Sequence, residues 1–512
     1  MGNDIEGFIR DFGVLVRMAQ EAQPHSSRGR ELVVTLSAHL GIEPGSIPVV
    51  IEEVAAHRFV DADIVLASLA ADGRCVGIGG GDQRHHMSFS DMVQQSELYP
   101  NFPLSQPDYA NLPIGPDEQR QAVALGLRLF HHDGVPMALL QRKAEPRYGR
   151  QDASLEVLCP DADVVAGFLA EFRRRMQRES VMKGQVLSFT TEDFGPGGAG
   201  VTFHPRPTLD AADVILPEGL LERVSEHALG IASHRQVLMA AGQHLKRGIL
   251  LYGPPGTGKT HTVRYLLSAS AGTTAILLSG GTLRHVGEAA RMARALQPSI
   301  VVLEDCDLIA EDRSFGHGPQ PLLFEVLDAM DGLDADADVT FVLTTNRVDM
   351  LERALAQRPG RVDLAVEVPL PGEHERAALL RLYGRDLAFS DDAIGSAAGR
   401  TEGTTASFTR ELVRRAVLAA ALRGVPVSDE HLLAAVDELM ADGASLTRSL
   451  LGSNGPVPED GVPAQAGESF GWGPGAQVHS GGYSPMGGPA IAGSVDVESQ
   501  QGFAAPQAHP LS

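Results

Sequence analysis

Cysteine and long apolar runs are scarce in this sequence. Only three cysteines occur among 512 residues, and the wide spacing of Cys75, Cys159 and Cys306 gives neither a disulfide framework nor a paired metal-ligand motif. No run approaches the roughly 18 apolar residues that a membrane-spanning helix needs. The N-terminus, MGNDIEGFIRDF, lacks the basic-then-apolar order of a signal peptide. These absences predict a cytoplasmic protein without a membrane span.

Positive charge is also in short supply. The chain has 42 Lys and Arg residues against 65 Asp and Glu residues, a formal net charge of −23. Such a chain repels phosphate backbones in bulk, so a nucleic-acid partner would need a local basic face and is not expected. Hydrophobic residues make up 43% of the chain, as in a globular protein. The length suffices for about three domains of ~150 residues each.

What the sequence does contain is a phosphate-binding pattern. An apolar run, Ile249–Tyr252, leads into GPPGTGKT, which fits G-x-x-x-x-G-K-[ST], and a helix-like stretch follows. The glycines let backbone N–H groups wrap around an anion at the N-terminus of that helix, Lys259 can reach the outer phosphates, and Thr260 can ligate Mg²⁺. A glycine-rich turn that binds nothing is the alternative, but it does not explain the flanking strand and helix. The residues predicted to contact ATP are Gly253, Pro254, Pro255, Gly256, Thr257, Gly258, Lys259, Thr260 and His261.

From about Leu209 onward, strand-length apolar runs alternate with helical stretches. The runs are short, almost continuously apolar and rich in branched residues, as buried parallel strands are. They lie at residues 249–252, 275–279, 300–303 and 339–344. This alternation predicts an α/β domain over residues 209–372, a P-loop NTPase core with a parallel sheet.

Two carboxylates, Glu304 and Asp305, directly follow the run at residues 300–303. An acidic strand end is commonly only solvated, but the carboxyl ends of parallel strands are where open α/β sheets hold ligands. Downstream of a phosphate loop, Glu304 can hold Mg²⁺ through water beside Thr260, and Asp305 can activate the water that attacks the γ-phosphate. The next strand ends in TTN, which places Asn346 to hold the same water.

A tight turn, RPGR, carries two guanidiniums, Arg358 and Arg361. A planar fork suits the charge that develops on a transferring phosphoryl group. Standing alone, these arginines would be read as a surface turn. After a phosphate loop and an acidic strand end, they become candidates for the catalytic site.

The flanking regions carry less chemistry. Residues 1–208 contain two short apolar runs that predict strands, Val49–Ile51 and Ile64–Ala67, and a helical stretch at Ala166–Arg178. We expect a small α+β domain here that binds a substrate or partner. Residues 451–512 contain no Lys or Arg and many Gly and Pro, which predicts a disordered tail.

The order of the motifs GPPGTGKT, LEDCD, MDGL, TTNR and RPGRVD resembles that of the AAA family of ATPases over Asp213–Gly443. The resemblance implies a ring, usually a hexamer, in which each ATP site is completed by arginine fingers from the neighbouring subunit. Arg358 and Arg361 occupy those positions, and Asn346 occupies that of the first sensor. A helical lid over residues 373–450 is also implied.

The same resemblance assigns two further segments. Asp331–Leu333 matches the inter-subunit signalling motif, and Leu283–Gly287 stands where the central-pore loop normally lies, with His285 in place of the usual aromatic residue. Near the second sensor, the usual Gly-Ala pair reads Ala406-Ser407.

The acidic pair also departs from the family pattern. Its usual order is Asp then Glu, whereas this chain has Glu304 then Asp305. With TTN and RPGRVD nearby, this order is similar to the clade of the mitochondrial Rieske-protein translocase, whose membrane anchor we do not find here.

Family members thread, unfold or disassemble macromolecules. The resemblance therefore predicts an ATPase that remodels a protein substrate, with the N-terminal region choosing that substrate. An interaction protein whose ATP state sets its assembly, with slow hydrolysis as a timer, is the alternative. A nucleic-acid motor is a more distant one.

Overall fold

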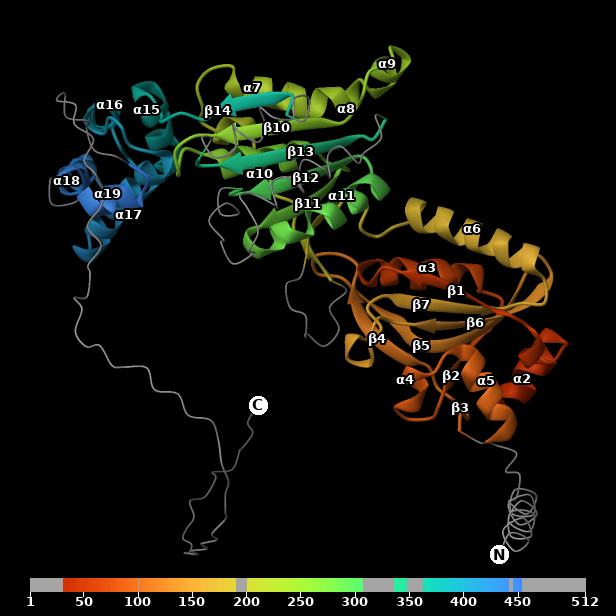
Figure 1. Ribbon diagram of the computed structural model, residues 1–512. Helices are drawn as coiled ribbons and strands as arrows, with labels where there is room; N and C mark the ends of the chain where they lie inside the picture. The colour runs from red at the N-terminus through yellow and green to blue at the C-terminus, as the bar shows by residue number, and fades with distance from the viewer. Residues whose placement is uncertain are drawn as a thin grey trace, which may run out of the picture. The chain divides into compact units, whose positions relative to one another are not determined.

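The computed structural model describes residues 31–99, 101–189, 200–306, 336–347, 362–441 and 445–453. Within these ranges the chain forms two β-sheets with their helices and a bundle of helices (Figure 1). The predicted tail begins too early, because residues 451–453 form a turn that is hydrogen-bonded to α19 (Ser445–Leu450), whereas the tail from residue 454 onward lies outside the described residues.

The first sheet has seven strands in the order β1-β7-β6-β5-β2-β3, with β4 beside β5, and all its pairings are antiparallel. β5 and β6 form a hairpin closed by Asp133 and Gly134, both with positive φ, as a two-residue turn requires. The strands are β1 (Val49–Val54), β2 (Arg74–Ile78), β3 (Leu104–Ser105), β4 (Asp108–Pro113), β5 (Gln119–His132), β6 (Val135–Arg142) and β7 (Ala153–Leu158).

Helices cover both faces of this sheet (Figure 1). On one face α3 and α6 pack, and the inner positions of α6, including Val165, Phe168 and Phe172, recur at helical spacing. On the other face α2 and α5 pack. The helices are α2 (Glu31–Leu40), α3 (Phe59–Leu69), α4 (Gln83–His86), α5 (Phe89–Leu98) and α6 (Ala162–Arg178).

The structure bears out two of the three elements predicted in this region and corrects one. Val49–Ile51 lies in β1, and Ala166–Arg178 lies in α6. Ile64–Ala67, predicted as a strand, lies inside α3. A short apolar run has the same appearance in a buried strand and in a helix buried on several sides, so periodicity could not separate the two.

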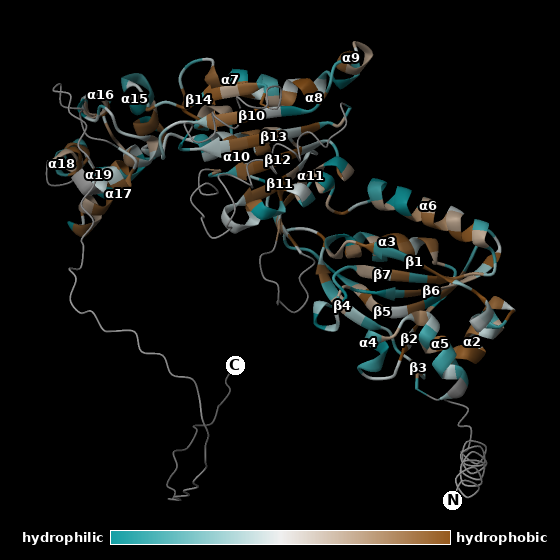
Figure 2. Ribbon diagram, in the orientation of Figure 1, coloured by the Kyte–Doolittle hydropathy of each residue, from teal (hydrophilic) through white to brown (hydrophobic). Residues whose placement is uncertain are grey.

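Seven strands also form the second sheet, in the order β14-β10-β13-β12-β11-β8-β9, and only the β8–β9 pair is antiparallel. The four runs predicted as parallel strands coincide with β10 to β13, which are mainly hydrophobic along their length (Figure 2). The strands are β8 (Val186–Phe189), β9 (Val201–His204), β10 (Arg247–Tyr252), β11 (Thr274–Ser279), β12 (Ser299–Glu304), β13 (Val339–Thr345) and β14 (Leu364–Glu367).

Alternate residues of these strands pack on opposite layers of helices. In β10, Ile249 and Leu251 join the core beneath α7 and α10, whereas Leu250 joins the core beneath α11. The helices that accompany this sheet are α7 (Leu220–Ser225), α8 (Ile231–Ser233), α9 (Arg235–Ala240), α10 (Lys259–Ala269) and α11 (Val286–Ala295).

The second sheet begins before the domain boundary that we predicted at residue 208. β8 and β9 precede that position, and β8 pairs with β11. Arg206, which follows β9, donates hydrogen bonds to the carbonyl oxygens of Leu267 at 2.7 Å and Thr273 at 2.6 Å, which ties this segment to the end of α10. A strand of four residues is too short to show a clear hydrophobic periodicity. The sequence therefore could not assign β8 and β9 to a sheet whose other strands mostly lie 70 or more residues later in the chain.

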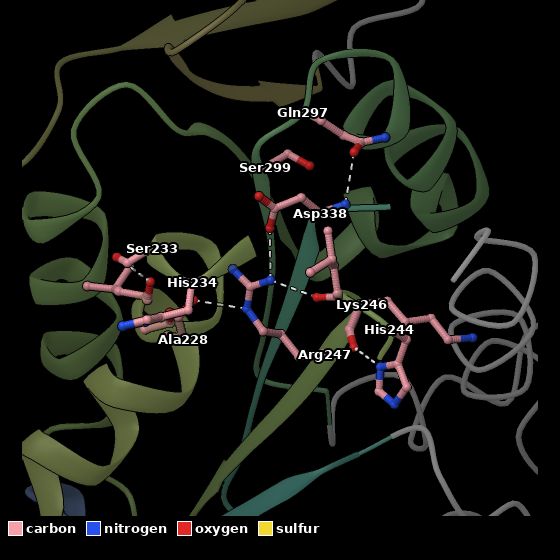
Figure 3. A network of polar contacts seen from close by, with 12 residues as sticks. Ala228, Ser233, His234, His244, Lys246, Arg247, Gln297, Ser299 and Asp338 are labelled. Atoms are coloured by element: carbon pink, nitrogen blue, oxygen red, sulfur yellow. Dashed lines mark hydrogen bonds and ion pairs between the residues drawn. The ribbon is translucent and has the colours of Figure 1, made fainter. Parts of the chain in front are cut away.

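A buried ion pair joins β10 to β13 at their amino ends (Figure 3). The Arg247 guanidinium donates to Asp338 Oδ1 at 2.9 Å, to the carbonyl of Leu245 at 2.8 Å and to that of Ala228 at 3.0 Å. The Asp338 N–H donates to Gln297 at 2.8 Å. Each charged group is paired and hydrogen-bonded. The ion pair therefore holds these strand ends together without leaving an unpaired charge in the protein interior.

After the second sheet the chain is helical, as predicted for residues 373–450. Apolar positions of these helices, such as Phe408, Leu412 and Leu432, meet in a core of their own. The helices are α15 (Glu373–Tyr383), α16 (Asp391–Arg400), α17 (Ala406–Leu422), α18 (Asp429–Met440) and α19 (Ser445–Leu450). Across the described ranges, every helix is too short or too polar to cross a membrane.

Candidate functional site

The loop between β10 and α10 is built on glycines with positive φ, among them Gly253 at +145° and Gly258 at +113°. A Cβ at Gly253 would lie 2.2 Å from the carbonyl oxygen of Val368, which follows β14. Only glycine allows this close approach, and it brings the loop against the neighbouring strand. The predicted loop therefore leaves the carboxyl end of β10 with a tightly fixed first residue.

Lys259 lies at the start of α10 and is 6% exposed. Its ammonium group donates to the carbonyl oxygens of Gly253 and Pro254, each at 2.8 Å, so the side chain folds back over the loop. In the first turn of α10, the N–H of Thr262 donates to the Gly258 carbonyl at 2.8 Å. The Lys259 ammonium group and the N–H groups of the first turn of α10 thus lie close together, and both kinds of group can bind an anion.

Thr260 and Glu304 come together from α10 and the end of β12. Thr260 lies close enough to Glu304 for its hydroxyl to lower the pKa of the carboxyl group. Burial and the charge of Asp305 raise the pKa of Glu304, while Thr260 and Arg264 oppose that shift. A hydroxyl and a carboxylate side by side are hard oxygen ligands, which suit Mg²⁺. These two residues therefore fit the metal that the sequence predicted for them.

Asp305 follows β12 with a φ of +52°, which is unusual for a residue with a side chain. Its N–H donates to the Thr344 hydroxyl at 3.0 Å, and the N–H of Cys306 donates to the Thr344 carbonyl at 2.9 Å. The left-handed backbone costs about 1–2 kcal/mol, which the bonds to β13 offset. Such strain is common at functional sites, and here it falls on the residue predicted to activate the attacking water.

Asn346 lies just beyond β13 and is half-buried. β13 pairs in parallel with β12 on one side and with β10 on the other, so Asn346 shares its sheet edge with the acidic pair and with the start of the phosphate loop. The structure thus brings the predicted residues of three strands to one edge.

The segment that contains these residues matches a family of known proteins. The family described as "ATPase family associated with various cellular activities (AAA)" matches residues 249–370. A proteasome-activating nucleotidase of Methanoculleus marisnigri is 34% identical over 285 residues, which cover 53% of this chain and 68% of that protein. This chain belongs to the AAA family of ATPases. Membership confirms the predicted fold class of the nucleotide-binding core and the predicted activity class, ATP hydrolysis.

Other relatives match over a smaller part of their length. The 26S proteasome regulatory subunit 8 homolog of Schizosaccharomyces pombe is 32% identical over 234 residues, 42% of this chain and 58% of that protein. The ATP-dependent zinc metalloprotease FtsH 4 of Sphaerobacter thermophilus is 34% identical over 256 residues, 47% of this chain and 38% of that protein. The chain thus spans from about two fifths to two thirds of the relatives it matches.

The helical lid of this AAA protein touches the phosphate loop. The N–H of Ser407, in the first turn of α17, donates to the Gly256 carbonyl at 3.2 Å. A Cβ at Gly256 would lie 3.0 Å from the Ser407 hydroxyl and 3.1 Å from that of Thr405. The Ala406-Ser407 pair therefore lies at the loop, as its match to the second-sensor position implies.

Two histidines have local roles in the structure. The ring of His261, a predicted ATP contact, hydrogen-bonds the Asp213 carbonyl at 3.1 Å, so the imidazole is directed to the segment before α7. His285 ends a 3₁₀ turn (Gly280–His285) that runs directly into α11, and Leu283 and Val286 are fully buried. The segment matched to the pore loop is thus a helical turn anchored in the core.

Some predicted elements fall outside the described residues. These are both finger candidates and the signalling motif: Arg358, Arg361 and Asp331–Leu333.

Sequence reasoning missed two threonines that hold the site. Thr344 is 1% exposed and fixes Asp305, and Thr405 is fully buried and lies against Gly256. Thr405 had a readable signal, because a threonine directly before a helical stretch is a typical N-cap, and its hydroxyl accepts from the N–H of Phe408. Thr344 had none, since its role depends on which strand lies beside β12.

Proposed function

We propose that this AAA protein binds Mg·ATP at the carboxyl edge of its second sheet and uses hydrolysis to remodel a protein substrate in a ring, usually a hexamer in this family. The observation that carries the site is the meeting of three groups: Lys259 in the loop, the Thr260–Glu304 contact, and Asp305 held on a strained backbone. Lys259 supplies a positive charge for the phosphates, Thr260 and Glu304 supply two metal ligands, and Asp305 supplies a general base.

Each residue has a distinct part in the reaction. Lys259 and the N–H groups of the loop bind the β- and γ-phosphates, and Thr260 and Glu304 would hold Mg²⁺, which would neutralise charge on the phosphate oxygens. Asp305 accepts a proton from the attacking water as the new P–O bond forms and the bond to ADP breaks. Asn346 orients the same water from the adjacent strand.

A ring assembly and a protein substrate are parts of this proposal that the names of the relatives support. One relative is a proteasome-activating nucleotidase, and another is a regulatory subunit of the 26S proteasome. In the ring, Arg358 and Arg361 would act on the neighbour's nucleotide, and the N-terminal sheet with its helices would choose the substrate. Neither name points to an assembly timer or a nucleic-acid motor.

Two finer assignments belong to the proposal as well. The order Glu304-Asp305 supports likeness to the clade of the Rieske-protein translocase. The wide spacing of the three cysteines supports a reducing compartment such as the cytoplasm.

The test compares two single variants of the full chain. Lys259→Ala should abolish nucleotide binding, because the cation over the loop is lost. Asp305→Asn should bind ATP as wild type does but release phosphate about 100-fold or more slowly, because the base is lost while the side-chain shape is kept. Fluorescent nucleotide titration measures the first effect, and steady-state phosphate release measures the second.

Undiminished phosphate release by both variants would overturn the assignment. Because Asp305→Asn is expected to hold ATP, it also serves as a trap for the substrate. Proteins recovered on this variant and absent from Lys259→Ala preparations are the candidates whose unfolding should then depend on ATP.

A further inference from the structure

The last described turn of the chain is firmly anchored. After α19, Gly452 adopts a φ of +73°, and the N–H of Ser453 donates to the Arg448 carbonyl at 2.8 Å, which closes the helix end. Arg448 is 7% exposed and donates to the carbonyl oxygens of Leu439 at 2.9 Å and Ala441 at 2.7 Å. The turn is thereby tied to the end of α18.

This turn, Leu451–Ser453, packs on the phosphate loop. A Cβ at Gly452 would lie 2.4 Å from the carbonyl oxygen of Pro255 and 3.3 Å from its ring. Real Cβ atoms do not approach a backbone oxygen so closely, so the contact requires glycine. Two backbones from residues far apart in the sequence therefore touch directly at the second proline of GPPGTGKT.

Thr405 joins the turn to the lid. Its hydroxyl donates to the Leu451 carbonyl at 2.7 Å, and its N–H donates to the Ser453 hydroxyl at 3.1 Å. Thr405 is fully buried and Ser453 is 1% exposed, so both bonds are shielded from water. The same threonine caps α17 and lies against Gly256.

The loop residues Pro255 and Gly256 are thus held from two sides. The C-terminal turn lies against Pro255, and the first turn of α17 lies against Gly256. A phosphate cradle made of backbone N–H groups works only when the backbone is already in its binding conformation, because each misdirected N–H loses its bond to the anion.

We infer that Leu451–Ser453 is a positioning element for the ATP site: it holds the phosphate loop, through Pro255 and Thr405, in the conformation that receives ATP. The inference rests on the proposed function. It assigns no contact with ATP to these residues, which act through the loop. Their loss should therefore weaken ATP binding and leave the chemical step, carried by Asp305, largely intact.

The first test is Gly452→Ala in the full chain, with Gly424→Ala as its matched control. Both glycines have a left-handed backbone, at +73° and +65°, so both variants carry the same conformational strain. Only the methyl group at position 452 meets the loop, since no described atom lies within 4 Å of a Cβ at Gly424. Gly452→Ala should raise KM for ATP about tenfold and change kcat by less than about threefold. Gly424→Ala should change neither.

A second pair tests the threonine. Thr405→Val removes the hydroxyl at nearly constant shape and should raise KM for ATP, whereas Thr405→Ser keeps the hydroxyl and should restore the wild-type KM. Ser453→Ala, which removes only the acceptor for the Thr405 N–H, gives a milder variant should Thr405→Val fail to fold. A merely structural role would lower thermal stability in these variants without shifting KM.

The outcomes separate this inference from the function on which it rests. If wild type binds and hydrolyses ATP and Gly452→Ala has the same KM as Gly424→Ala, the positioning role is wrong while the ATP site stands. If Lys259→Ala and Asp305→Asn release phosphate as fast as wild type, the proposed function itself fails. A rise in KM confined to Gly452→Ala, Thr405→Val and Ser453→Ala supports the inference.

Discussion

The two sheets of this protein use buried and half-buried acidic groups in different ways. In the first sheet, Asp63 lies on α3 with a side chain 3% exposed, and it accepts hydrogen bonds from four donors. In the second sheet, Glu304 and Asp305 stand where a strand ends, beside a loop that binds anions. This difference indicates that the position of an acidic residue on its sheet decides whether it is structural or available to a catalytic site.

The Asp63 network shows how a carboxylate is kept structural. Arg128 donates to it at 2.9 Å, Gln141 at 3.1 Å, the Val123 N–H at 3.2 Å and Arg120 at 3.3 Å. These bonds compensate the cost of burying the charge, and they link α3 to strands β5 and β6. Acceptors already bonded in this way are poorly suited to a metal or a substrate.

The second sheet contains both kinds of acidic group, at opposite ends of its strands. At the amino ends, Asp338 is closed off by Arg247 in a buried pair, much as Asp63 is (Figure 3). At the carboxyl ends, the strands give way to loops, and Glu304 lies near the Thr260 hydroxyl and the charges of Asp305 and Arg264. The relevant contrast is therefore between sheet edges, as much as between sheets.

The largest expected effect on stability comes from Asp63→Ala. It leaves Arg128 buried without its carboxylate, so the free energy of unfolding should fall by about 3–5 kcal/mol. Urea unfolding measures the loss. Because Asp63 belongs to the first sheet, KM for ATP of the remaining folded protein should not change. A rise in KM together with the loss of stability would contradict this contrast, because the Asp63 network would then contribute to ATP binding as well as to stability.

A smaller effect is expected from Asp338→Asn, at the amino ends of the second sheet. The amide keeps the shape and one hydrogen bond to Arg247 but removes the charge, which should cost about 1.5–3 kcal/mol of unfolding free energy. Asp305→Asn makes the same chemical change at the carboxyl ends, and there we expect slow hydrolysis with little loss of stability. Thermal unfolding and phosphate release should be measured on both variants. Asp338→Asn should lose stability and keep phosphate release, whereas Asp305→Asn should keep stability and lose phosphate release. If both variants lost the same property, the position of an acidic residue at one or the other end of the strands would not decide whether it is structural or catalytic.

The smallest effect expected is that of Ser88→Ala. The Ser88 hydroxyl caps α5 by accepting from the Asp91 N–H at 3.1 Å, and its removal should cost about 1 kcal/mol. Ser390→Ala removes an equivalent cap in the lid, where the hydroxyl accepts from the Ala393 N–H at 3.2 Å. Equal losses in denaturant unfolding would show that caps act locally in both regions. A much larger loss at Ser390 would instead indicate that the lid couples its stability to the ATP site.

Much of the ATP site could be predicted from the sequence because its signals are local. The glycine spacing, Lys259 and Thr260 occupy one continuous stretch, and Glu304, Asp305 and Asn346 lie at the ends of strands that are visible in the sequence as apolar runs. Parallel strands bring their carboxyl ends to one edge, so the order of motifs alone placed these residues together. α6 could be predicted for the same reason, because its apolar positions repeat at helical spacing within one continuous stretch.

Only the tertiary structure decided what depends on contacts between distant segments. The run Ile64–Ala67 is helical because the sheet and α6 bury it, and β8 belongs to the second sheet because it pairs with β11. The contact of Gly452 with Pro255 joins residues nearly two hundred positions apart. A sequence specifies local conformation through the period of its apolar residues and its turn residues, whereas such contacts are selected by the packing of the whole chain.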